Sequence, residues 1–444
     1  MNKESIKEVL VSQKKLFLEK SELFGRDIVE GFHERFSKIR EAIIITGIRR
    51  CGKSSLMRLL WDEFKEKENL TADQFLYVNF EDERLAGFGH EDFSKLLEAH
   101  GELWSPDKTK RIFLFLDEIQ NVALWEKWIN RIYEEDKYRI FITGSNATLL
   151  SSELSTALTG RNIPITLFPL SFHEYLVHFK NKKISSSSFY DQTEKTEIKK
   201  IFEEYLVRGG MPEYVKTGSV ELVQEYFKDI ISRDIVNRYR VKYKQELKEL
   251  ARLLLATPGQ IQSLNAISRS VGMKNISTVK NYLQYLEDSF LFFRLSLFSF
   301  SLKKQIYNPG KYFVADAAFF QNIAFKFSDN LGSVYENIVF SELKWDSRNE
   351  LFYVKTEKNF EVDFAVKKKN KLEKLIQVSV ELEDKKTAER EERALLAAMQ
   401  EFNLSEGLIL NRDLEKTGER EGKNIFYIPL WKWLLRRYWI PEKI

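Results

Sequence analysis

The residues best suited to chemistry form a short stretch bounded by two glycines. Residues 47–55 read Gly-Ile-Arg-Arg-Cys-Gly-Lys-Ser-Ser, which fits the G-x-x-x-x-G-K-S pattern of a phosphate-binding P-loop. In such a loop the backbone N–H groups surround the phosphates, the lysine reaches the terminal phosphates, and the serine hydroxyl is a ligand of Mg²⁺. A glycine turn with a surface lysine is the alternative. The pattern predicts that a nucleotide is bound by Gly47, Arg50, Cys51, Gly52, Lys53, Ser54 and Ser55, with Ser54 also on Mg²⁺.

Two adjacent carboxylates end a second apolar stretch, residues 111–116. Adjacent residues of a strand point to opposite faces, so Asp117 and Glu118 are expected to have different tasks. Asp117 is placed to hold Mg²⁺, the Walker-B role, and Glu118 is placed to act as a general base toward the attacking water. The alternative is a strand that ends in a charged turn, but the position of the pair downstream of a P-loop favours catalysis.

Two further polar groups are candidates for contact with the terminal phosphate. Asn146, and after it Ser145, follows the predicted strand 138–143, where a polar side chain can touch the γ-phosphate or the water. Arg161 precedes the predicted strand 163–168 and could stabilise charge on the transferred phosphoryl group. The sequence does not decide whether Arg161 acts within the chain or on a neighbouring one, and an exposed surface arginine is the alternative.

These residues require a parallel sheet that brings the ends of its strands together. Residues 42–46 are apolar and β-branched, as expected of a buried strand, and a helical pattern opens at residue 54. Ligands bind at the carboxyl ends of the strands in open α/β sheets, and a helix N-terminus there favours anions. Further strands are predicted over residues 74–80, 111–116, 138–143 and 163–168, after a helical lead-in over residues 1–40. The fold class is therefore α/β, with a P-loop NTPase core.

Composition narrows the remaining choices. The 444 residues suggest about two to four domains, and 70 Lys and Arg against 66 Asp and Glu neither demand nor exclude nucleic acid. Cys51 is the single cysteine, so an intramolecular disulfide and a cysteine-based zinc site are excluded. The five histidines show no metal-ligand spacing. With no apolar run near the roughly 20 residues of a membrane span, we expect a cytoplasmic protein without a membrane partner.

The order of these parts resembles a known family. The P-loop, the strand ending in Asp117, the Thr-Gly-Ser-Asn of residues 143–146 and the stretch 158–176 resemble a prokaryotic branch of the AAA-type ATPases, in which a C-terminal domain of unknown function follows the ATPase. The resemblance implies ATP and Mg²⁺ as ligands, a strand inserted between the P-loop and Walker-B strands, and a helical lid. Residues 207–214 look like the lid segment, which implies that Gly210 and Pro212 pack near the adenine; an ordinary helix-ending turn is the alternative.

The pattern of predicted elements changes over residues 245–308. Helices are predicted over residues 245–256, 263–270 and 277–290, and a hairpin over residues 295–306 would complete a winged helix. Lys280, Lys303 and Lys304 favour DNA, whereas Glu287 and Asp288 oppose it, so a protein contact or a structural role stays open. The serine run 185–188 in the preceding segment predicts a flexible insertion.

The last part of the chain resembles the restriction-endonuclease-like fold. Glu336 on a helix, Asp363 on a strand and Gln377 on the next strand match the acidic positions of that site, where carboxylates hold Mg²⁺ and a lysine activates water. Ser379 stands where the lysine is expected, and Gln377 replaces the usual acid. We therefore expect a degenerate, inactive nuclease site, unless Lys374 or another lysine substitutes. The aromatic tail, residues 426–440, is expected to dock as a strand and a helix.

The sequence thus predicts four ranges: an ATPase core over residues 1–178, an insertion and helical lid over 179–243, a winged-helix-like domain over 244–310 and a nuclease-like domain over 311–444. The leading hypothesis is an Mg²⁺-dependent AAA-type ATPase whose nucleotide state controls a C-terminal DNA- or protein-binding module. The alternatives are a nucleotide-gated interaction scaffold that hydrolyses ATP slowly and an ATP-dependent nuclease. The oligomeric state stays open.

Overall fold

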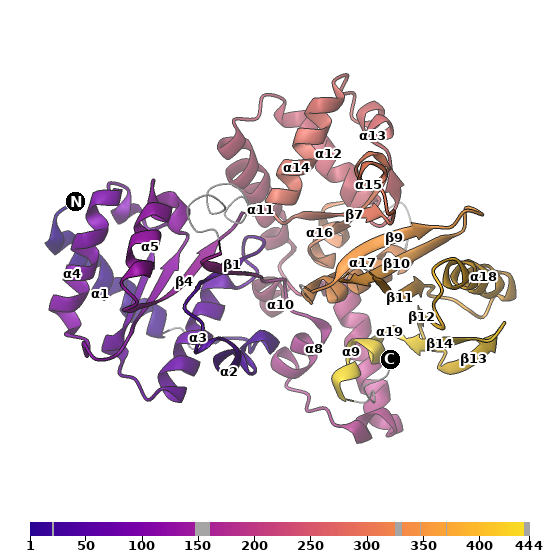
Figure 1. Cartoon of the computed structure of the whole chain (residues 1–444), viewed down its shortest axis with the longest axis horizontal. Coiled ribbons are helices and arrows are strands. Elements are labelled where there is room, and N and C mark those ends of the chain that lie inside the picture. Colours follow the sequence, from indigo (N-terminus) through magenta and orange to yellow (C-terminus); the bar gives the residue numbers. More distant parts are fainter. Residues whose placement is uncertain (20–21, 147–159, 325–330, 347, 370, 439–444) are drawn as a thin grey trace. The chain divides into compact units, whose positions relative to one another are not determined.

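A computed structural model of the chain describes residues 1–444 except 20–21, 147–159, 325–330, 347, 370 and 439–444 (Figure 1). It divides into two compact units: Met1–Leu167 with Asp288–Phe290, and Phe168–Glu287 with Leu291–Ile444. The finer division into four ranges stays a prediction. In the described ranges, no helix is long and apolar enough to cross a membrane.

A five-stranded parallel sheet with the order β2-β3-β4-β1-β5 organises the first unit. The predicted strands are all present and have shifted by at most a few residues. Because β4 lies between β1 and β3, the inserted strand implied by the family resemblance is confirmed. The strand bounds are β1 Ala42–Thr46, β2 Phe75–Asn79, β3 Ile112–Asp117, β4 Tyr138–Gly144 and β5 Asn162–Thr166.

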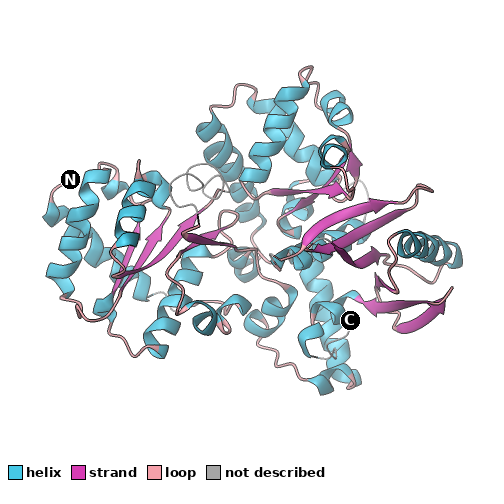
Figure 2. Ribbon diagram, viewed as in Figure 1, coloured by secondary structure: helices cyan, strands magenta, loops and turns pink. Residues whose placement is uncertain are grey.

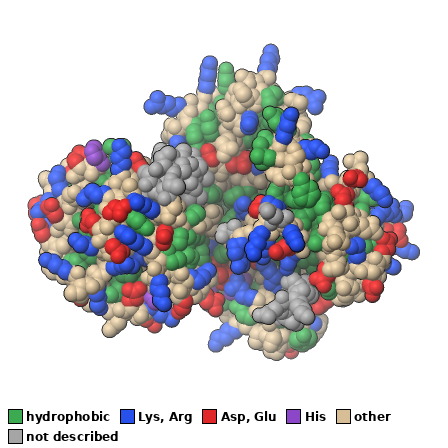
Figure 3. Space-filling model, viewed as in Figure 1, with side chains coloured by type: hydrophobic (Ala, Val, Ile, Leu, Met, Phe, Trp, Pro, Cys, Tyr) green, Lys and Arg blue, Asp and Glu red, His purple; other side chains and the backbone are tan. Residues whose placement is uncertain are grey.

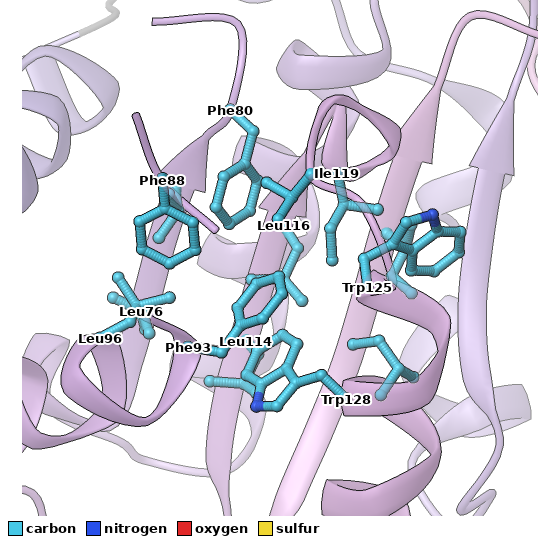
Figure 4. Close-up of a cluster of buried hydrophobic side chains, with 14 of the residues drawn as sticks. Leu76, Phe80, Phe88, Phe93, Leu96, Leu114, Leu116, Ile119, Trp125 and Trp128 are labelled. Carbon is cyan, nitrogen blue, oxygen red and sulfur yellow. The ribbon is translucent and has the colours of Figure 1, made fainter. Parts of the chain in front are cut away.

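Helices cover both faces of this sheet (Figure 2). Side chains alternate along β3: Phe113 and Phe115 pack with α3 through Phe64 and Trp61, while Leu114 and Leu116 join a cluster formed with α1, α4 and α5. In that cluster the rings of Phe93 and Trp128 stack at 4.0 Å (Figure 4). The helices are α1 Lys3–Glu19, α2 Phe32–Phe36, α3 Lys53–Lys67, α4 Phe93–Trp104 and α5 Trp125–Glu134.

The second unit begins with helices. After α8 the chain continues as a wider π-helical turn, Tyr175–Phe179, and α11 likewise continues through Ile230–Asn237. The three helices predicted between residues 245 and 290 are present as α12, α13 and α14. The bounds are α8 Phe172–Glu174, α9 Gln192–Arg208, α10 Pro212–Thr217, α11 Val220–Asp229, α12 Lys244–Ala256, α13 Leu264–Ser270 and α14 Ile276–Asp288.

A nine-stranded mixed sheet with the order β13-β14-β12-β11-β10-β9-β7-β8-β6 runs through the rest of this unit. Strand β12 is parallel to β11 and β14, and β7 is parallel to β9, while the other pairs are antiparallel. The strands are β6 Ile261–Gln262, β7 Phe292–Leu297, β8 Gly310–Val314, β9 Glu350–Lys355, β10 Glu361–Lys368, β11 Lys371–Val378, β12 Glu406–Asn411, β13 Lys416–Arg420 and β14 Lys423–Pro429. The helices between and after them are α15 Leu302–Tyr307, α16 Ala317–Ile323, α17 Leu331–Trp345, α18 Lys385–Glu401 and α19 Leu430–Leu434.

One local prediction is wrong. The hairpin predicted over residues 295–306 is a strand followed by helix α15, because the Ser301 hydroxyl accepts a hydrogen bond from the Lys304 N–H and caps a helix there. Within the predicted insertion, residues 180–195, the serine run forms a 3₁₀ turn, Ser186–Phe189, in which Phe189 is buried and stacks with Trp431; the flexibility of this segment stays a prediction. In contrast, the tail docks as predicted through β14 and α19, although residues 439 and 440 lie outside the described ranges.

Candidate phosphate-binding site

The loop between β1 and α3 has a backbone that requires glycine. Gly47 has a φ of 148°, and a Cβ there would lie 2.1 Å from the carbonyl oxygen of Leu167. Gly52 has a φ of 103° and directly precedes α3, to which it offers no side-chain cap. Arg50 also has a positive φ, 68°. An uncapped helix N-terminus presents backbone N–H groups to an anion, which is compatible with the predicted phosphate site.

The Lys53 ammonium is held inside this loop. Its side chain is 5% exposed, and it donates hydrogen bonds to the carbonyl oxygens of Gly47 at 3.1 Å and Ile48 at 3.3 Å. It also lies 3.8 Å from a carboxylate oxygen of Glu118. The P-loop lysine and the end of β3, which are distant in sequence, therefore meet at one edge of the sheet.

Asp117 is fixed by two hydroxyl groups. Tyr77 on β2 donates a hydrogen bond to one carboxylate oxygen at 2.9 Å, and Thr143 on β4 donates to the other. The Thr143 oxygen in turn accepts a hydrogen bond from the backbone N–H of Glu118 at 3.1 Å. Asp117 is 1% exposed, so these bonds set the orientation of a buried acidic group.

Glu118 leaves the strand in a left-handed conformation, with a φ of 51°. It accepts a hydrogen bond from the Gln120 amide and lies beside Lys53. Burial raises the pKa of Glu118; the ammonium of Lys53 acts in the opposite sense, and the charge of Asp117 adds to the rise. A carboxyl group with a raised pKa beside a phosphate-binding lysine is suited to accept a proton.

The other P-loop residues occupy distinct positions. The Cys51 side chain is fully buried, which raises the pKa of its thiol, while its carbonyl oxygen accepts a hydrogen bond from Arg26 at 3.0 Å. The Cys51 sulfur lies on the side of Gly47, 3.1 Å from where a Cβ on that glycine would stand. Ser54 and Ser55 are half-buried on the first turn of α3. Their assigned roles toward nucleotide and Mg²⁺ stay predictions.

The end of β4 lies between the loop and Asp117. Thr46 pairs in register with Gly144, so the residues that follow, Ser145 and Asn146, reach the same edge as the P-loop. Both side chains are buried, with Asn146 1% exposed. The predicted contact of Asn146 with a γ-phosphate is compatible with this place.

Arg161 is not brought to this edge. Arg161 precedes β5, and its carbonyl oxygen accepts a hydrogen bond from the N–H of Ala42 at the start of β1. The P-loop follows the other end of β1, and the length of the strand separates the two ends by about 15 Å. Its side chain pairs with Glu134 at 2.7 Å and with Asn130. Of the two possibilities left open for Arg161, contact with a phosphate held by Lys53 in the same chain does not fit this position. A role toward a neighbouring chain stays a prediction.

Gly210 and Pro212 belong to the second unit. The Gly210 N–H donates to the Asp316 carboxylate at 2.7 Å, and its carbonyl oxygen accepts from the Leu170 N–H at 2.8 Å. A Cβ on Gly210 would lie 2.1 Å from the Leu170 oxygen, and Pro212 begins α10. These contacts give the turn a structural purpose, and the predicted contact with adenine stays a prediction.

The predicted nuclease-like residues also lie in the second unit. Glu336 and Asp363 do come together, but around the ammonium of Lys311, which the sequence analysis did not single out. The Gln377 oxygen accepts a hydrogen bond from the Asp363 N–H at 3.3 Å, and its amide donates to Glu391 at 2.6 Å. Tyr77 and Thr143 are the other residues that sequence analysis missed.

A Gly47→Ala substitution tests the loop backbone. The methyl group would meet the Leu167 carbonyl in a backbone conformation that side chains rarely adopt, so we expect a loss of about 3 kcal/mol in the free energy of unfolding. Chemical denaturation measures it. The matched control is Gly101→Ala within α4, where nothing lies within 4 Å of the added Cβ and we expect a gain of about 0.5–1 kcal/mol. Equal stability of the two variants would contradict the described loop.

Comparisons with known proteins agree with this architecture. A family model described as "AAA domain" matches residues 39–176, and one described as "Domain of unknown function (DUF8612)" matches residues 199–329. The chain is 35% identical to an uncharacterised protein of Methanocaldococcus jannaschii, MJ1544, over 88% of both chains. It is 32% identical to an uncharacterised protein of Haemophilus influenzae, over 68% of this chain and 73% of that one.

Among solved structures, the Walker-type ATPase PABY2304 of Pyrococcus abyssi is 15% identical, with a TM-score of 0.42, over 67% of this chain and 95% of that chain. The family assignment rests on the sequence relatives and on the match of residues 39–176 to the AAA domain. The chain therefore belongs to the AAA-type P-loop ATPases that carry a second domain of unknown function.

Proposed function

We propose that the first unit binds ATP with Mg²⁺ at the edge formed by the P-loop and the end of β3, and hydrolyses it. One observation carries this proposal: Lys53 and Glu118, one at the start of α3 and the other just after β3, approach to 3.8 Å beside the buried Asp117. A cation for phosphate, a carboxylate for a metal and a carboxylate for water are the three groups that phosphoryl transfer to water needs.

Each group has a separate task in the proposed reaction. The Lys53 ammonium exchanges the carbonyl oxygens of Gly47 and Ile48 for phosphate oxygens, which carry more negative charge. Glu118 orients the attacking water and accepts its proton. Tyr77 and Thr143 act as positioning residues, because their hydroxyls fix Asp117 and, through Thr143, the backbone of Glu118.

The donors near the loop fit Mg²⁺. The Ser54 hydroxyl and the Asp117 carboxylate are oxygen ligands, which this hard cation prefers, and they belong to the two segments that meet at this edge. When bound, the ion neutralises charge on the phosphates. Phosphate release from ATP, followed with Mg²⁺ and again with excess EDTA, tests the proposal. We expect turnover only with Mg²⁺, and a purified protein that binds no ATP would refute it.

We further propose that the nucleotide state controls DNA binding by the second unit. Helices α12, α13 and α14 with strands β6, β7 and β8 follow the element order of a winged helix. The exposed residues of α14 include Lys280, Asn281 and Gln284, whereas Glu287 and Asp288 at its end are half-buried. Lys and Arg side chains project over the region of α12–α14 in the space-filling view (Figure 3). Cationic and amide side chains on one helix suit phosphates and base edges.

A Lys280→Ala variant tests the DNA proposal. Removing one phosphate contact should weaken duplex binding by roughly 3- to 10-fold and lower the slope of log affinity against log salt by about one. Fluorescence anisotropy at several salt concentrations measures both. The control is Lys386→Ala, which removes an exposed lysine from α18 and should leave affinity and slope unchanged. Equal effects of both substitutions would assign the loss to net charge alone.

A nucleotide-gated scaffold is the second candidate, and α15 favours it. Phe300, Leu302 and Tyr307 on and beside this helix are 89%, 68% and 79% exposed, and apolar side chains gathered on a surface favour a protein contact. ATP turnover in the presence of DNA separates the two candidates. A DNA-coupled ATPase is accelerated by duplex DNA, whereas a slow switch keeps its basal rate.

A further inference from the structure

A lysine lies at the centre of the carboxylates of the second unit. The Lys311 ammonium on β8 is 2.9 Å from oxygens of Glu361 and Asp363 on β10, and 3.4 Å from an oxygen of Glu336 on α17. The Lys311 side chain is 3% exposed and that of Asp363 is 9% exposed. One ammonium thus touches three carboxylates from two different elements, and a buried lysine requires such partners.

Hydrogen bonds to the backbone hold α17 against β8 and fix the Asp363 carboxylate. The Asn337 side chain accepts a hydrogen bond from the Val314 N–H at 2.8 Å and donates to the Val314 carbonyl at 2.9 Å, which ties α17 to β8 next to Glu336. The second carboxylate oxygen of Asp363 accepts from the Val378 N–H at 3.0 Å. The juxtaposition is therefore set by main-chain bonds on either side, and does not depend on the ion pairs alone.

The charges around Lys311 favour its ammonium form. Three carboxylates lie within 3.4 Å of its nitrogen, so the single positive charge of the lysine faces three acidic groups. In the described part of the chain, no three His, Cys, Asp or Glu side chains are grouped so as to hold a metal ion.

We propose that the Lys311 ammonium takes the place of a divalent cation in this cluster, so that the carboxylates form a metal-independent centre that joins α17 to β8 and β10. A cation placed among these oxygens would have to lie next to the ammonium, and two such charges repel strongly in a site of low dielectric constant. The centre then cannot supply the metal that a nuclease needs. This inference does not rest on ATP hydrolysis by the first unit.

The first test uses the chain without any change at the cluster. Calorimetric titration of the nucleotide-free Lys53→Ala protein with Ca²⁺ tests the cluster, because Ca²⁺ accepts irregular sets of oxygen ligands. The Asp363→Asn change then shows whether any bound Ca²⁺ lies in the second unit. We expect no Ca²⁺ bound tighter than millimolar. A tight Ca²⁺ site that disappears in Lys53→Ala/Asp363→Asn would overturn the proposal, whether or not the Lys311 variants fold.

The second test removes the ammonium. Lys311→Met leaves the carboxylates without a counter-charge, and we expect the melting temperature in EDTA to fall by about 10 °C. Millimolar Ca²⁺ should then restore at least half of the loss, since oxygens that lie 2.9–3.4 Å from the ammonium nitrogen need to move inward by at most about 1 Å to reach the 2.3–2.6 Å that Ca²⁺ requires. Wild type should melt at the same temperature with and without Ca²⁺.

Two controls make the second test specific. Lys311→Met/Asp363→Asn carries one negative charge less, so we expect it to melt above Lys311→Met in EDTA and to lose the response to Ca²⁺. Lys367→Met breaks an ion pair with Glu350 on the same sheet and should change the melting temperature by about 1 °C. Stabilisation of wild type by Ca²⁺ to the same degree as Lys311→Met, or a folded Lys311→Met indifferent to Ca²⁺, would overturn the proposal.

Discussion

Lys53→Ala should weaken ATP binding by at least about 100-fold. The substitution removes the buried cation of the P-loop, and hydrogen bonds between charged partners contribute about 1.5–3 kcal/mol each, so the loss of contact with two phosphates exceeds about 3 kcal/mol. A fluorescent ATP analogue titrated into both proteins measures the dissociation constants. The loss of the ammonium also removes its hydrogen bonds to the carbonyl oxygens of Gly47 and Ile48, of which the second still accepts from the Cys51 N–H, so melting curves are needed to show that the variant is folded.

The matched control is Lys67→Ala at the other end of α3. Lys67 is exposed and pairs with Glu34 at 3.4 Å, so its removal changes the net charge equally without touching the loop. We expect the affinity of this variant to remain within about 2-fold of wild type, because surface ion pairs contribute less than about 1 kcal/mol. Equal affinity of wild type and Lys53→Ala would contradict a phosphate site at this loop.

The parts of the site that are local in sequence could be predicted. The pattern of residues 47–55 indicates a loop, a cation and the start of a helix within nine residues. The apolar strand before Asp117 can likewise be recognised without knowing which strands lie beside it. Both sets of residues lie at the carboxyl edge of the sheet, as the parallel strands require. The same rule contained the information about Arg161, since a residue that precedes a parallel strand lies at the amino edge.

Contacts made across strands could not be predicted in the same way. The bonds from Tyr77 and Thr143 to Asp117 depend on the register of three neighbouring strands, which no local pattern reveals. Lys311 did leave a signal, because a lysine in the otherwise apolar segment Gly310–Val314 must find a buried counter-charge. Its partners, however, are supplied by β10 and α17, so only the fold identifies them.

Glu118→Gln should bind ATP but lose turnover by roughly 10²–10⁴-fold, the usual contribution of a general base. Glutamine keeps the shape of the side chain and can still contact Gln120, but it cannot accept a proton. Binding should change by only a few-fold, because Lys53 and the loop backbone are left in place. Single-turnover phosphate release, measured beside analogue binding, separates the two effects.

The pH dependence gives this prediction a second readout. Glu118 acts as a base only when its carboxylate is ionised, so turnover is full above the pKa of Glu118 and falls as the pH drops through that pKa. Because burial raises this pKa, turnover should begin to fall at a higher pH than it would with an ordinary glutamate. The residual turnover of Glu118→Gln should lack this acidic limb. Glu83→Gln, which alters an exposed carboxylate after β2, is the control and should keep both the rate and the limb. If Glu118→Gln hydrolysed ATP at the wild-type rate, the proton of the attacking water would have to pass to another group. The proposed role of Glu118 as the general base would then fail, whereas the proposed role of Lys53 in ATP binding would stand.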